Sequence, residues 1–202
     1  MVKQERALRT RRALIRAGAQ AFADEGFTAA SLTAISRAAG VSNGALHFHF
    51  ENKMALARAV EEEALATLRH VAQGALERED AALSALVKAT HGLVGRIADD
   101  VVVRAGFGLC DDLGRHEGVC PRREWQRWVE ETVRRAEGDG WLSAGVAASD
   151  AAAAVVAATV GLEVLGSHDR TWWSKERVTG FWELLLPRLT TRHASIDAAG
   201  GG

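Results

Sequence analysis

Proline and cysteine are scarce in this chain of 202 residues, which contains two of each. Proline interrupts helices because it lacks a backbone N–H, and no segment shows the sustained alternation of apolar and polar residues that is typical of strands. Few prolines and no alternation together predict an all-α chain. Cys110 and Cys120 are too few for a disulfide scaffold and are predicted to be plain thiols in a reducing compartment, with a redox switch as the alternative.

Long apolar runs and enzyme signatures are also missing. The sequence has no stretch of about 18 uncharged apolar residues, and no apolar segment of a secretory signal follows the charged start MVKQERALRTRR. A cytoplasmic protein without a membrane span is therefore expected. There is no glycine-rich phosphate loop, no nucleophile elbow and no HExxH motif, so neither enzymatic activity nor a cofactor is expected.

The net charge of −1 conceals an uneven distribution. Residues 1–53 hold eight basic and four acidic side chains, a net charge of +4, whereas the remaining residues hold 17 basic and 22 acidic side chains, a net charge of −5. A basic N-terminal region in an otherwise acidic chain indicates that the N-terminal region binds a polyanion such as DNA. On charge alone, a solvated helix face is an equally open interpretation.

Short helices follow one another within the basic region. Apolar residues recur at helical spacing over 14–22, Gly26 is placed to end that helix, and Ser31 and Ser42 are placed to cap two short helices separated by Gly40. A long helix, a short helix, a tight turn and a second short helix are typical of a helix-turn-helix, whose last helix enters the major groove of DNA. After residue 75 the pattern predicts longer helices at 80–97, 100–111, 122–138, 149–167 and 174–190.

The stretch His47-Phe48-His49 belongs to the second short helix. On that helix Leu46 and Phe50 lie one turn apart and are predicted to face the core. His47 and His49 project about 200° apart, so they cannot bind one metal ion together, and no further ligand follows at metal-site spacing. They are predicted instead to donate hydrogen bonds to DNA phosphates, and no metal site is expected.

A motif signature covers most of residues 10–56. It comprises Thr10-Arg11, Ala17, Phe22, Gly26-Phe27, Ser31-Leu32, Ile35, Ala39-Gly40-Val41-Ser42, Gly44-Ala45-Leu46, Phe48-His49-Phe50, Asn52-Lys53 and Leu56. In these residues the chain resembles the tetracycline-repressor (TetR) family of bacterial transcription regulators. The resemblance implies a helix-turn-helix DNA-binding domain at residues 1–52, a helical ligand-sensing and dimerisation domain at 53–192, and a homodimer that binds a pseudo-palindromic DNA operator.

Further segments resemble the γ-butyrolactone receptors of actinobacteria within that family. They are the N-terminal arm from Lys3 to Arg11, the segment 103–106 with Leu109, and Trp125. This second resemblance implies a repressor that is released from DNA by a small hydrophobic signal of γ-butyrolactone or furan type. Two alternatives stay open: a related repressor that responds to antibiotics or other apolar ligands, and a metal or redox sensor on the same fold.

DNA contacts are expected along the helix-turn-helix and the arm. Small residues at the start of the second short helix allow close approach to base edges, and a helix N-terminus attracts phosphate. The predicted DNA-binding residues are Arg9, Thr33, Ser42, Asn43, Gly44, Ala45, His47, Phe48, His49 and Lys53. Asn43 stands where the family pattern has lysine, and His47 where it has tyrosine. The missing charge predicts weaker DNA binding with a shallower salt dependence.

The ligand pocket and the dimer interface are predicted in the C-terminal region. The resemblance places Trp125 in the pocket wall. Further candidate walls, chosen because their helices should surround the cavity, are Phe107, Leu86, Thr90 and Val160. The small-residue helix 151–161 and the bulky segment 181–186 resemble the two helices through which the family dimerises. Residues 193–202 are predicted to form a disordered tail.

Overall fold

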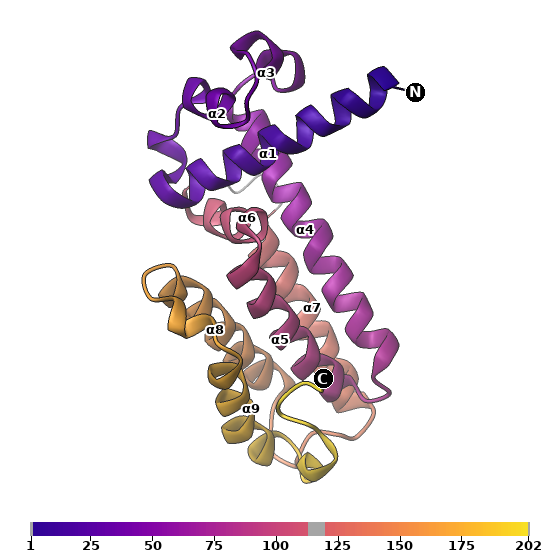
Figure 1. The fold of residues 1–202 in the computed structure, drawn as a ribbon. Helices are drawn as coiled ribbons and strands as arrows, with labels where there is room; N and C mark the ends of the chain where they lie inside the picture. The colour runs from indigo at the N-terminus through magenta and orange to yellow at the C-terminus, as the bar shows by residue number, and fades with distance from the viewer. Residues whose placement is uncertain (1, 113–119, 202) are drawn as a thin grey trace. The chain divides into compact units, whose positions relative to one another are not determined.

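The computed structural model describes residues 2–112 and 120–201, and over these ranges its regular structure is helical (Figure 1). The described elements are α1 (Val2–Ala29), α2 (Leu32–Ala38), α3 (Asn43–His49), α4 (Lys53–Arg78), α5 (Ala82–Asp99), α6 (Val101–Asp112), α7 (Pro121–Gly138), α8 (Ala148–Gly166), η1 (Arg170–Trp173), α9 (Lys175–Leu189) and η2 (His193–Ser195). The predicted all-α class is confirmed. The five helices predicted after residue 75 begin and end within two residues of the observed ones.

The helices form two compact units. The first comprises α1, α2, α3, the start of α4 as far as Thr67, and α6. The second comprises the rest of α4 from Leu68, α5, and the chain from Arg122 onward. This division differs from the boundary predicted after residue 52, because α4 contributes to both units and α6 joins the N-terminal one.

The first unit has a core that α1 shares with the short helices. Leu14 and Phe22 of the predicted apolar stripe are buried, in one cluster with Ile35 of α2. Gly18 lets α4 approach, since a Cβ there would lie 2.9 Å from Leu56 Cδ2. Gly26 has a non-helical backbone, with a φ of 78° and a ψ of 163°, at the position where the helix was predicted to end. A short helical segment follows this kink and continues to Ala29.

Helix α6 completes the core of the first unit. Val102, Ala105 and Leu109 are buried in the same cluster as the apolar face of α1. Gly106 lies so close to α4 that a Cβ at this position would overlap the Cβ of Ala64. The N-terminal unit therefore depends on α6 for part of its hydrophobic core, although the rest of α4 from Leu68 and the whole of α5 lie between them in sequence.

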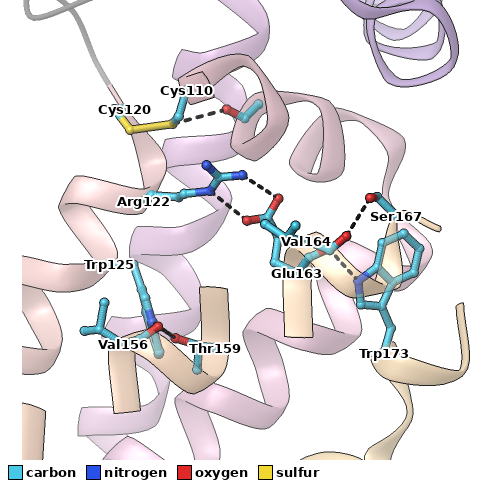
Figure 2. Close-up of polar contacts among 11 residues, drawn as sticks. Cys110, Cys120, Arg122, Trp125, Val156, Thr159, Glu163, Val164, Ser167 and Trp173 are labelled. Carbon is cyan, nitrogen blue, oxygen red and sulfur yellow. Dashed lines mark hydrogen bonds and ion pairs between the residues drawn. A yellow bond between two sulfur atoms is a disulfide. The ribbon is translucent and has the colours of Figure 1, made fainter. Parts of the chain in front are cut away.

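A disulfide joins Cys110, in the last turn of α6, to Cys120, which directly precedes α7 (Figure 2). The two Cα atoms lie 5.5 Å apart, within the range that a disulfide spans. The prediction of two plain thiols is therefore wrong for this conformation. The two cysteines are ten residues apart in sequence, and this spacing alone does not predict that they form a disulfide.

In the second unit, α8 is the most apolar helix. By length and composition alone it could cross a membrane, with a mean hydropathy of 1.6 over its most apolar window. One side of it is buried against the rest of the unit, including Ala151, Val155 and Leu162, and Glu163 forms an ion pair with Arg122. Helix α8 is thus a partly buried core helix.

The end of α8 is fixed by two polar contacts (Figure 2). Arg122 binds Glu163 with both arms of its guanidinium, at 2.7 Å from Nε to Oε2 and 3.0 Å from the terminal nitrogen to Oε1. The two side chains are 14% and 9% exposed. The indole N–H of Trp173 donates to the backbone carbonyl of Glu163 at 3.3 Å, and its ring fills the space that a Cβ at Gly166 would need. Helix α7 and η1 are therefore both held to α8.

Disorder was predicted for residues 193–202, of which the structure describes 193–201. Ile196 is buried, and Nε2 of His91 on α5 lies 2.8 Å from the carbonyl oxygen of Ala198. The carboxylate of Asp197 accepts hydrogen bonds from the backbone N–H groups of Ala199 and Gly201. One apolar side chain and several backbone contacts hold the tail, and its glycine-rich composition gave no sign of them.

Acidification is expected to destabilise the second unit through His91. Burial lowers the pKa of His91 below its ordinary value of 6.5, and the positive charge of Lys175 acts in the same direction, against the hydrogen bond to the Ala198 carbonyl oxygen and the charge of Asp197. Because the unfolded chain then binds the proton more readily, the stabilisation is complete above pH 6.5 and declines as the pH falls below it. The melting temperature should fall less between pH 7.5 and 5.5 in His91→Gln than in the wild type, and an equal fall would contradict this assignment.

Candidate DNA interface and ligand-sensing core

The turn between α2 and α3 is closed by local backbone contacts. Gly40 has a φ of +69°, a conformation that side chains with a Cβ rarely adopt. The N–H of Val41 donates to the carbonyl oxygen of Ser36 at 3.0 Å. The hydroxyl oxygen of Ser42 then accepts the N–H of Ala45 at 3.1 Å and caps α3. Ser42 thus has a structural role in addition to the DNA contact predicted for it.

Helix α3 has an inward and an outward face. Leu46 is fully buried and Phe50 is 3% exposed, which confirms their predicted place in the core. Asn43 and His47 are exposed, and Phe48 is 82% exposed. An exposed fraction that large is unusual for phenylalanine and leaves the aromatic ring available to a partner.

The remaining predicted DNA-binding residues belong to the same unit. His49 is half-buried, with its ring edge-on to that of Phe48 at a centroid distance of 5.2 Å. Ala45 and Lys53 are also half-buried, and the exposed members are Arg9, Thr33, Ser42 and Gly44. The ten residues share the first unit, and their contacts with DNA stay a prediction.

Lys53 has a structural role that the sequence did not reveal. Its ammonium group donates to the backbone carbonyl oxygens of Thr28 and Ala30, both at 2.9 Å. The nitrogen also lies 4.8 Å from the centroid of the Phe27 ring, a cation–π distance. Lys53 therefore ties the start of α4 to the end of α1, and two of its three N–H donors are engaged.

Replacing Lys53 by alanine is expected to lower the stability of the N-terminal unit. Two charge-assisted hydrogen bonds are lost, and partial exposure limits the effect to about 1–2 kcal/mol in the free energy of unfolding. Arg9→Ala is the matched control, because Arg9 is exposed. It should leave unfolding unchanged and reduce only the salt dependence of DNA binding, by about one ion. Chemical denaturation measures the first effect and DNA titration at several salt concentrations the second; unaltered unfolding of Lys53→Ala would contradict the structural role.

Among the described residues, no group of three or more His, Cys, Asp or Glu side chains is placed to hold a metal ion. His47 and His49 belong to the short helix α3, and neither joins such a group. Within the described ranges the geometry therefore offers a surface for binding rather than a metal centre.

Four of the five predicted ligand-binding residues belong to the second unit. Trp125, Leu86 and Thr90 are buried. The indole N–H of Trp125 donates to the hydroxyl of Thr159 at 2.8 Å (Figure 2), and its ring stacks on that of Trp128 at 5.2 Å. Val160 lies instead in a surface groove of about 670 Å³ between α7 and α8. Phe107 belongs to α6 in the first unit.

A further tryptophan of the second unit has an unusual environment. Trp182 of α9 is fully buried, and its indole N–H finds no acceptor among the described residues. Buried indole N–H groups usually have a partner. Trp182 was assigned to the dimer interface from its sequence segment, but the structure turns it and Leu186 inward and leaves Leu184 81% exposed. The helical periodicity of α9 was the available signal for this division.

Comparison with known proteins agrees with the helix-turn-helix geometry. The family model for bacterial regulatory proteins of the tetR family matches residues 14–60. The A-factor receptor protein of Streptomyces griseus is 28% identical over 193 residues, which cover 94% of this chain and 67% of the receptor.

Two solved structures extend the similarity over nearly the whole chain. The crystal structure of a γ-butyrolactone receptor, an ArpA-like protein, has a TM-score of 0.81 and 27% identity, and the match covers 96% of this chain and 95% of that one. CprB from Streptomyces coelicolor, solved in complex with its operator sequence, has a TM-score of 0.80 and 28% identity, with 96% of both chains covered. The tetR family model matches the helix-turn-helix region, and the relatives match nearly the whole chain. The chain therefore belongs to the TetR family of bacterial transcriptional regulators and is not an enzyme.

Proposed function

We propose that this DNA-binding regulator is a cytoplasmic homodimeric repressor that a small hydrophobic signal of γ-butyrolactone or furan type releases from a pseudo-palindromic operator. The outward face of α3 supports the proposed DNA binding, because Phe48 is 82% exposed there and Asn43 and His47 are also exposed. Asparagine can bond adenine, and an apolar ring suits the thymine methyl group in the major groove. The solved operator complex of CprB, which is 28% identical, supports this use of the unit.

A second copy of the chain is the proposed occupant of the outer face of α8 and α9. Val164 and Leu165 on α8 are 40% and 45% exposed and Leu184 on α9 is 81% exposed, and a second copy that covers them would remove this apolar surface from water. Two copies that meet through this face would each contribute one α3, and half-sites about one helical turn apart, or a multiple, would then suit both. Sedimentation of the wild type and of Leu184→Glu tests this interface, and a monomeric wild type would contradict it.

The second unit offers a polar anchor for a ligand in an apolar surrounding. The N–H of Trp182 is buried and unpaired among the described residues, whereas that of Trp125 is satisfied by Thr159. A lactone carbonyl or a furan oxygen is an acceptor of the kind that an unpaired indole N–H can bind. Helix α9 packs on α5, which carries the buried Leu86 and Thr90. We therefore add Trp182 to the proposed pocket residues Trp125, Leu86, Thr90 and Val160, all of which belong to the second unit.

Release from DNA by a defined ligand tests the whole proposal. The first step is to show that the protein retards a duplex taken from upstream of its own gene. A synthetic γ-butyrolactone, a synthetic furan and a panel of antibiotics are then titrated into the complex. Release by the butyrolactone or furan supports the proposal. Release by antibiotics alone would identify a repressor with a different ligand class, and a failure to bind any upstream duplex would contradict the operator assignment.

Substituting each of the two buried tryptophans by phenylalanine should distinguish a role in ligand binding from a role in folding stability. Both variants lose the same ring volume from a buried site. Trp182→Phe removes a donor that is unpaired in the free protein, so it should cost no stability beyond that volume, while the affinity for the releasing ligand falls about tenfold. Trp125→Phe also leaves the Thr159 hydroxyl without its donor and should destabilise the fold by about 1–2 kcal/mol more. Calorimetry with the ligand and thermal unfolding without it measure these effects. Unaltered ligand affinity in Trp182→Phe would remove it from the pocket.

A further inference from the structure

The disulfide between Cys110 and Cys120 belongs to the DNA-binding unit. Both cysteines are half-buried rather than enclosed in the core. Their Cα atoms lie 5.5 Å apart, and no free cysteine remains among the described residues. A regulator that meets DNA works in a reducing compartment, where structural disulfides are rare and those that form are usually transient. A partly exposed pair with a short separation fits a reversible bond better than a permanent one.

Helix α6 links this pair to the surface that meets DNA. Cys110 directly follows Leu109, which is 1% exposed in the core that α6 shares with α1. One turn earlier, Gly106 lies against Ala64 of α4 with no room for a Cβ. The same core includes Leu46 and Phe50, which hold α3 in place. Because packed cores transmit displacements rather than absorb them, a tie at the end of α6 constrains the helices that carry the DNA-binding face.

We propose that Cys110 and Cys120 form a reversible thiol–disulfide site through which a hydroperoxide weakens DNA binding. Cys120 directly precedes α7, where the positive end of the helix dipole favours a thiolate. The thiolate attacks the peroxide oxygen, the O–O bond breaks, and the alkoxide takes a proton to leave as an alcohol, so that Cys120 becomes a sulfenic acid. The Cys110 thiol then attacks that sulfur and water leaves. Two thiols are oxidised, and one hydroperoxide is reduced to an alcohol and water.

Oxidation is expected to weaken DNA binding because the disulfide restricts the movement of α6. With both thiols reduced, the end of α6 can shift, and the helices packed on it can adjust to the spacing of the DNA grooves. With the disulfide formed, the end of α6 is fixed to the start of α7, and that adjustment is restricted. Oxidation should therefore weaken operator binding by about five- to tenfold, which is the lower part of the range for coupling between two sites in one protein.

The experiment uses the full chain reduced by dithiothreitol and freed of reductant, and hydrogen peroxide as the probe. Three readouts are followed before and after treatment: free thiols with intact mass, hydrogen exchange of the α6 amides, and affinity for the upstream duplex. The expected result is the loss of both thiols as an intramolecular disulfide, slower exchange at the end of α6, weaker DNA binding, and full reversal by dithiothreitol. Failure to form the bond would overturn the proposal, as would a bond that leaves DNA affinity equal or tighter.

Single-cysteine variants separate the disulfide from general oxidation. Cys110→Ser and Cys120→Ser should bind DNA as the reduced wild type does and should lose the response to peroxide, with Cys110→Ser leaving a trappable sulfenic acid at Cys120. If both variants still respond to peroxide, the inference is wrong. The affinity readout rests on the proposed operator, whereas thiol loss and exchange do not. A protein that forms the disulfide and slows α6 exchange but binds no upstream duplex would thus contradict the operator and leave the thiol–disulfide site standing.

Discussion

Glu163→Ala is expected to lower the free energy of unfolding by about 3–5 kcal/mol, the usual result of removing one member of a buried ion pair. Arg122 is 14% exposed and donates two hydrogen bonds to the Glu163 carboxylate, so its charge would remain largely away from water. Chemical denaturation measures the change. The matched control is Arg69→Ala, which removes an ion pair with Glu124 in which the arginine is 63% exposed; such pairs contribute about 0–1 kcal/mol.

A double substitution distinguishes the cost of removing one charge from the value of the pair. Arg122→Met combined with Glu163→Leu replaces both charges by apolar groups of similar size. Buried pairs exchanged in this way are often as stable as the originals or more stable. The double variant should therefore recover most of the stability that Glu163→Ala loses. A double variant as unstable as the single one would show that the contacts around the pair, and not the loss of one of its two charges, are responsible.

Local features of the N-terminal unit were predictable from the sequence because they depend on residues close together in the chain. The i, i+4 spacing of Leu46 and Phe50 placed both in the core. Ser42 lies directly before an apolar helical pattern, and it caps α3 as expected. Asn52 likewise accepts the N–H of Ala55 at the start of α4. These features need no knowledge of the remaining fold.

Contacts between distant segments were not predictable in the same way. The carbonyl oxygens that Lys53 binds lie 23 and 25 residues earlier in the sequence, and no pattern marks a lysine for that role. The membership of α6 in the first unit depends on its packing against α1 and α4. Nothing in its composition distinguishes it from a helix of the second unit.

The hydrogen-bond partners in the candidate pocket were not predictable from the sequence either. Trp125 and Trp182 are both large aromatic residues on helices with an apolar face, and the resemblance to known receptors selected only Trp125. The structure separates them by the partner of each indole N–H, which is Thr159 for Trp125 and no described residue for Trp182. The sequence gives the residue type, but the hydrogen-bond partner follows from the packing of α8 and α9 within the second unit.

Two phenylalanines of the helix-turn-helix should separate folding from DNA binding. Phe50→Ala removes a ring that is 3% exposed in the core and should cost about 3–5 kcal/mol of folding stability. Phe48→Ala removes a ring that is 82% exposed, two residues earlier, and surface substitutions of this kind usually change stability by about 0.5 kcal/mol or less. The two variants have the same chemical change, so any difference in unfolding reports their place on α3.

Phe48→Ala should reduce DNA affinity although it changes folding stability little. If its ring meets a base edge, Phe48→Ala should weaken binding to the upstream duplex about tenfold, which corresponds to about 1.4 kcal/mol, while binding to unrelated DNA stays nearly constant because that binding depends on phosphate charge. Fluorescence polarisation with both duplexes measures the ratio. An equal loss on both would assign Phe48 to positioning on the backbone. No loss on either would mean that the exposed face of α3 is not the surface that contacts DNA, because Phe48 is the most exposed of its large apolar side chains.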